Sequence, residues 1–191
     1  MSQPPESTAL PAPFRDDVAS LRQALATPER PDVALSEVRA PQRTAPYAVA
    51  FTADVRRRQT VVATGRFVVL HDPAGQRGWQ GHTRVVALVQ ADTDQEMAGD
   101  AALTAVGWGW LTEALADRGA QHTAAAGTVT RTISSRFGQL DALDDSGVEI
   151  RASWTPLQVD GGHQLAAHLG AWSDVLCAAA GLPPRGVAAL R

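Results

Sequence analysis

Residues 47–70 read YAVAFTADVRRRQTVVATGRFVVL, and two alternating patterns in this stretch decide the fold class. Apolar side chains stand at every second position from Tyr47 to Val55, and a similar alternation returns between Val61 and Leu70. A period of two residues is typical of β-strands with one buried face. The four residues between the patterns, 56–59, are few enough for a hairpin. The stretch therefore predicts two neighbouring antiparallel strands.

Strand signals extend outward from this hairpin over residues 33–91. A turn over residues 71–78 contains Pro73 and Gly75, which favour a reversal of the chain, and a long strand follows it to about Ala91. Two further strands are predicted at about 121–137 and 147–155. The second of these alternates cleanly between apolar and polar residues, which indicates one buried and one wet face.

Three helices complete the pattern. The first runs from near Pro13 to Pro28, the second over 100–118 and the third over 161–180, and we expect Asp100 and Asp160 to cap the last two. The resulting order, α-β(4)-α-β(2)-α, predicts an α+β fold with a mainly antiparallel sheet. The simplest packing places the helices on one face of the sheet and leaves the other face partly open.

Length and composition suit one globular domain. The chain has 191 residues, of which 45% are hydrophobic and 19% charged. We expect a disordered tail over residues 1–12, which are rich in Pro, Ser and Gln, a single α+β domain over 13–182, and a C-terminal tail over 183–191.

Net charge and cysteine content limit the classes of partner and the cellular compartment that we expect. The formal net charge is −3, which gives no overall attraction to nucleic acids or anionic membranes. The single cysteine, Cys177, excludes an intramolecular disulfide and suggests a reducing compartment. We find no secretion signal and no apolar run long enough to span a membrane, and therefore expect a cytoplasmic protein.

No catalytic or metal-binding constellation stands out. His163 and His168 are five residues apart, which on a helix does not place them as a metal-binding pair. The acidic run 92–96 resembles the start of a calcium loop, but Met97 occupies the position that needs glycine. We therefore expect no cofactor and no metal, and lean away from an enzyme.

Arginines on or near the predicted strands, together with two tryptophans and one histidine, are the candidate binding residues. Some of the arginines can converge on the open face with nearby threonines, depending on strand register, and Trp79 follows a glycine-rich turn. The full set is Arg43, Arg66, Trp79, His82, Arg84, Trp108, Arg131 and Arg151.

Five segments carry a family resemblance, namely 40–50, 63–75, 106–115, 127–131 and 149–157. Through them the chain resembles the actinobacterial domain-of-unknown-function family numbered 3000, over about residues 13–184. The resemblance implies a bacterial cytoplasmic protein and carries over no catalytic residue. Members of that family are often encoded beside a ribonuclease D-type exonuclease, which adds some weight to a role in RNA metabolism.

Three functions stay open at this point. The leading hypothesis is a non-catalytic protein-binding or adaptor module with a protein partner, and we expect this module to form a homodimer. The second is an RNA-associated factor that uses the arginines of the sheet face. The third is a small-molecule binder or enzyme with a pocket near Trp79, His82 and Trp108.

Overall fold

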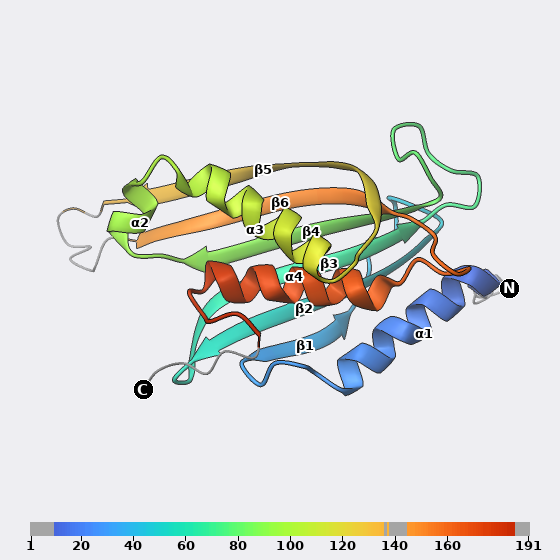
Figure 1. Cartoon of the computed structure of the whole chain (residues 1–191), viewed down its shortest axis with the longest axis horizontal. Helices are drawn as coiled ribbons and strands as arrows, with labels where there is room; N and C mark the ends of the chain where they lie inside the picture. The colour runs from blue at the N-terminus through green and yellow to red at the C-terminus, as the bar shows by residue number, and fades with distance from the viewer. Residues whose placement is uncertain (1–9, 136, 138–144, 186–191) are drawn as a thin grey trace, which may run out of the picture.

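The computed structural model describes residues 10–135, 137 and 145–185, and within them six strands form one antiparallel sheet beside four helices (Figure 1). The strands are β1 (Val33–Val38), β2 (Tyr47–Arg57), β3 (Thr60–His71), β4 (Thr83–Asp92), β5 (His122–Ser134) and β6 (Asp145–Pro156). The helices are α1 (Ala12–Ala26), α2 (Gln95–Gly99), α3 (Leu103–Asp117) and α4 (Leu165–Ala179). The α+β class and the predicted element order are confirmed. Most of the two predicted tails, 1–9 and 186–191, lies outside the described residues.

The strand order is β1-β2-β3-β4-β6-β5. The first four strands form a meander, as the alternating patterns predict, because each pairs with the next one along the chain. β6 then pairs with β4, and within the described part of the chain β5 pairs only with β6. The last strand in sequence is therefore an inner strand, and β5 forms an edge of the sheet.

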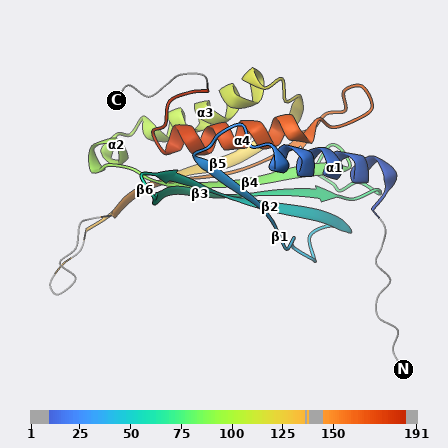
Figure 2. The same cartoon turned by 90° about the horizontal axis from the view of Figure 1, so that it is seen from below.

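Helices α1, α3 and α4 cover one face of the sheet, and no helix of the described residues lies on the opposite face (Figure 2). The covered side holds the main core, in which Phe67 of β3 packs between Trp154 of β6 and Trp172 of α4. Alternate residues of β2, from Val49 to Val55, point into this core and are buried. The structure confirms the prediction that the helices pack on one face of the sheet.

Gly65 lets α4 approach the sheet closely. A Cβ atom added at Gly65 would lie 2.7 Å from the Trp172 ring and 2.7 Å from the Leu88 carbonyl oxygen. In the space that the missing side chain leaves, the Trp172 indole N–H donates to the Leu88 carbonyl at 3.0 Å. A glycine within a strand often marks such a close approach.

The helix starts differ from the sequence prediction. The end of the acidic run begins the short helix α2, which the sequence did not predict, and the Asp94 carboxylate caps its first turn. Asp100 ends α2, and its carboxylate accepts a hydrogen bond from the Ala102 backbone N–H at 2.8 Å in the turn that leads into α3, whereas Asp160 lies in a turn before α4, which begins after Gln164. In both cases a turn stands between the acidic residue and the helix, and hydropathy patterns do not reveal such turns.

Candidate functional site

The sheet face opposite the helices, here called the open face, brings two of the predicted arginines into one row. Arg66 pairs with Leu88 across β3 and β4, and Leu88 pairs with Arg151 across β4 and β6. Thr52 on β2 and Thr128 on β5 extend the row at its two ends. Because directly paired residues of a sheet point to the same face, these five side chains form a central row. Two cations flank a half-buried leucine in it.

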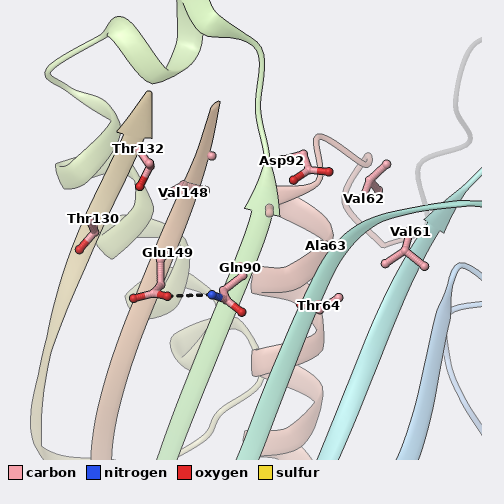
Figure 3. Close-up of a pocket in the computed structure, with 12 residues that line it drawn as sticks. Val61, Val62, Ala63, Thr64, Gln90, Asp92, Thr130, Thr132, Val148 and Glu149 are labelled. Carbon is pink, nitrogen blue, oxygen red and sulfur yellow. Dashed lines mark hydrogen bonds between the residues drawn. The ribbon is translucent and has the colours of Figure 1, made fainter. Parts of the chain in front are cut away.

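A second row of polar side chains runs beside the central row. It contains Asp54, Thr64, Gln90, Glu149 and Thr130, which are paired in that order across the strands. Several of these residues line a hollow of about 310 Å³ on the same face (Figure 3).

Glu149 links the two rows. Its carboxylate accepts a hydrogen bond from Gln90 Nε2 at 2.8 Å, drawn in Figure 3, and one from Arg151 Nε at 2.6 Å. The bond from Arg151 holds the pKa of the Glu149 carboxyl below its ordinary value, and the bond from Gln90 adds to this effect. The Arg151 side chain is nevertheless 69% exposed, so its guanidinium can still contact a partner.

Apolar surface adjoins the central row. Val86 of β4 is 39% exposed, and with Leu88 and Ala126 it lines a shallow depression of about 660 Å³ over β4, β6 and β5. Thr128 and Arg151 stand at the rim of the same depression. The open face thus combines charged, hydroxyl and apolar groups within a few strands.

One corner of the open face is covered by the chain itself. Ala50, Val68 and Leu70 form a small second core there, against which half-buried Trp79 packs. The Thr155 hydroxyl donates to the Trp79 carbonyl and fixes the loop before β4. Trp79, predicted as a candidate binding residue, is therefore held in this packing and is only half-exposed.

Arg84 belongs to the covered corner and is only 8% exposed. Its guanidinium donates to the Ser153 hydroxyl at 2.7 Å, the Ala124 carbonyl at 2.9 Å and the Thr155 hydroxyl at 3.1 Å. Burial lowers the pKa of Arg84 from its ordinary value. Its donors are used to join β4 with β5 and β6, so Arg84 is a structural residue.

The other predicted site residues do not join the central row. Arg131 points to the helix side, where its guanidinium donates to the Ala98 and Gly99 carbonyls of α2 at 3.1 and 2.8 Å. Arg43 is exposed in the loop between β1 and β2, and His82 is exposed in the loop between β3 and β4.

Trp79 and Trp108 do not share a pocket. Trp108 packs with the main core on the helix side, where a Cβ atom at Gly127 would come within 2.8 Å of its ring. Trp79 packs on the open face, so the sheet separates the two indoles. The pocket expected near Trp79, His82 and Trp108 is therefore not formed.

A comparison with protein families matches residues 10–188 to the family described as "Protein of unknown function (DUF3000)". The chain belongs to this family. The DUF3000 match spans all the helices and strands described above, which confirms the family resemblance seen in the sequence. No curated protein and no solved structure matches the chain.

Buried histidines form a second polar group in this DUF3000 protein, and the sequence did not predict their contacts with α1. Asp17 of α1 accepts from the His163 backbone N–H at 3.0 Å, and its other oxygen lies 2.6 Å from His163 Nδ1. His71 stacks on Phe14 and lies 3.0 Å from the Thr83 hydroxyl. The contacts join α1 to the loop before α4 and to the end of β3, which favours a structural role.

Neither metal binding nor membrane crossing finds support in the described part of the DUF3000 chain. No group of three or more His, Cys, Asp or Glu side chains there is arranged to hold a metal ion. Among the same residues, no helix has the length and apolar character needed to cross a membrane. Cys177 is buried, which raises the pKa of its thiol to about 11 and disfavours the reactive thiolate.

Proposed function

We propose that this DUF3000 chain is a non-catalytic binding module that holds a protein partner on its open face. The observation that carries the proposal is the central row, in which Arg66 and Arg151 flank Leu88 on a face that no helix covers. Arginine beside apolar and hydroxyl groups is typical of protein interfaces, because its planar guanidinium both stacks and donates several hydrogen bonds.

The balance of charge favours a protein over RNA. Asp54 and Glu149 lie in the row next to the two cations, so a phosphate backbone would meet carboxylates as well as guanidinium groups. RNA binding gains its affinity from several cations acting together. Arg84 is buried and Arg131 points to the helix side, so neither adds a cation to the open face.

A partner with mixed chemistry fits the open face better. Its carboxylates would pair with Arg66 and Arg151, and its apolar side chains would cover Val86 and Leu88 in the shallow depression. The broad, open shape of that depression suits a protein surface or an extended segment more than an enclosed small molecule.

The test is an affinity purification with a matched pair of variants. The tagged wild-type chain, the R66A/R151A double variant and an R15A/R58A control are used to capture proteins from a lysate of the cells that encode the chain. Arg15 and Arg58 are exposed and lie on α1 and in the β2–β3 turn, so the control removes the same charge away from the open face. Each capture is divided into nuclease-treated and untreated halves.

We expect a stoichiometric protein that survives nuclease, is retained by R15A/R58A and is lost from R66A/R151A. The melting temperatures of the three chains should agree closely, because exposed arginines contribute little to stability. Equal capture by both double variants would remove the central row from consideration. Loss of all partners on nuclease treatment, with strongly salt-dependent binding of a single-stranded RNA oligonucleotide, would replace the proposal by an RNA-associated role.

A further inference from the structure

β5 presents a long sheet edge. It has 13 residues, and its pairing with β6 is continuous from Ala126 to Ser134. Along its other side, no strand of the described residues pairs with it. Such an edge offers a row of backbone donors and acceptors to another strand, and proteins usually blunt it with charges, proline or bulges.

The features that usually prevent an edge strand from pairing with another chain are missing from this stretch. Residues 126–134 read AGTVTRTIS and contain no proline, lysine or acidic residue, and the one bulge lies before them, between Thr123 and Ala126. The only charged side chain, Arg131, is drawn toward α2 by its bonds to the Ala98 and Gly99 carbonyls. The opposite edge is protected differently, because β1 has only six residues and its Glu37 is paired with Arg22 of α1.

Large apolar side chains accompany the β5 edge. Ile133 of β5 is 51% exposed, Val106 of α3 is 46% exposed and Met97 of α2 is 40% exposed. Both helices pack against β5, so these side chains belong to the same end of the sheet. Exposed apolar groups beside an unpaired strand are typical of an interface between proteins.

We propose that β5 pairs antiparallel with β5 of a second copy of this chain, in a register centred on Thr130. Threonines stand at every second position around this centre, so Thr128 meets the partner's Thr132 and Thr130 meets the partner's Thr130. Such threonine pairs are favourable across antiparallel strands. Arg131 then lies opposite the partner's Val129, which keeps the two guanidinium groups apart.

The occupant is a second copy because the edge complements itself. A two-fold axis through the paired strands places the same patch on both subunits, as closed dimers require. The axis stands perpendicular to the sheet, so the helices of both copies lie on one side. The two six-stranded sheets become continuous, and the two open faces join into one surface. This goes beyond the proposed function, because the dimer forms whether or not the open face holds a partner.

The test measures the mass of the protein in solution and then cross-links the two subunits through a cysteine variant. We expect the purified full chain to sediment at twice its 20.1 kDa mass. In T130K the two new lysines meet at the centre of the interface, and the midpoint concentration for dimer formation should rise roughly tenfold or more. T64K is the matched control, because Thr64 is equally an exposed threonine of the open face but lies on the inner strand β3.

A cysteine variant tests the register. In T130C the two thiols of a dimer would lie within disulfide distance across the strands, and mild oxidation should give a covalent dimer. T64C should stay a monomer under the same denaturing, non-reducing conditions. The native Cys177 is buried and does not interfere.

Three results would overturn the proposal. They are a wild-type chain that stays a 20.1 kDa monomer at high concentration, a T130K variant that dimerises as wild type does, and a T130C variant that does not cross-link. Circular dichroism of each variant shows whether it is folded. If T130K does not fold, the cross-linking result of T130C still decides the proposal.

Discussion

His168 makes the stability of the fold depend on pH. The ring is fully buried on α4, and its Nδ1 accepts a hydrogen bond from the Trp154 indole N–H at 3.0 Å. The proton of the neutral ring is therefore on Nε2, which has no hydrogen-bond partner within the described residues. The pKa of His168 is lowered to about 3, mainly by burial. The nearby His122 and His163 also lower this pKa, and together they outweigh Asp17, which raises it.

The magnitude follows from the difference between the folded and unfolded states. An unfolded histidine takes up a proton near pH 6.5, whereas folded His168 stays neutral until about pH 3. The stabilising contribution is fully present above pH 6.5 and is lost as the pH falls toward 3, because only the unfolded chain gains the proton. Between pH 7.5 and pH 5.0 this difference lowers the free energy of unfolding by about 2 kcal/mol.

Urea unfolding of the wild type and of H168Q, at pH 7.5 and pH 5.0 and at one protein concentration, isolates this contribution. Glutamine keeps an acceptor for the indole N–H and does not titrate. The loss of unfolding free energy on acidification should be about 2 kcal/mol smaller in H168Q than in the wild type. His71, whose pKa is also lowered by burial, contributes equally to both chains. The same pH dependence in wild type and H168Q would refute the reasoning.

Two further predictions concern the sheet. R84M should lower the free energy of unfolding by about 2–4 kcal/mol in urea titration, because it leaves the hydroxyl oxygens of half-buried Ser153 and buried Thr155 without their charged donor. R84K should not restore stability, since lysine lacks the forked geometry that reaches both acceptors. G127A should lower the free energy of unfolding by about 1–3 kcal/mol, because the added Cβ meets the Trp108 ring at 2.8 Å and the Arg151 carbonyl. An unchanged urea midpoint in either R84M or G127A would contradict the packing described for that residue.

The fold was predictable where periodicity and burial agree. The alternation from Tyr47 to Val55 predicts a half-buried strand, and the structure buries the apolar members of that set from Val49 onward and half-buries Tyr47. The order of the strands in the sheet was not predictable, because no local pattern shows that β6 lies between β4 and β5. The turns before α3 and α4 were missed for a related reason. Asp100 and Asp160 look like helix caps in sequence, and only the backbone shows that they belong to turns.

The candidate site was predictable only in part. Some of the predicted arginines were expected on the open face, but the place of Arg66 and Arg151 in one row depends on the register across β3, β4 and β6. Arg84 shows the same alternation as Arg151, yet a loop packed over its end of the sheet buries it. The Asp17–His163 contact joins residues 146 positions apart, and no spacing rule connects them. Such differences come from tertiary packing, which a single strand's sequence does not encode.

The position of β6 between β4 and β5 constrains how the chain can assemble during synthesis. A ribosome makes β5 before β6, so the emerging chain holds a thirteen-residue strand whose neighbour does not yet exist. The free side of β4 is available at that moment, and β5 could occupy it in a non-native order. Native assembly requires β6 to pair with β4 on one side and with β5 on the other. The late pairing of β6 is therefore the step at which a nascent chain is most exposed to misfolding and aggregation.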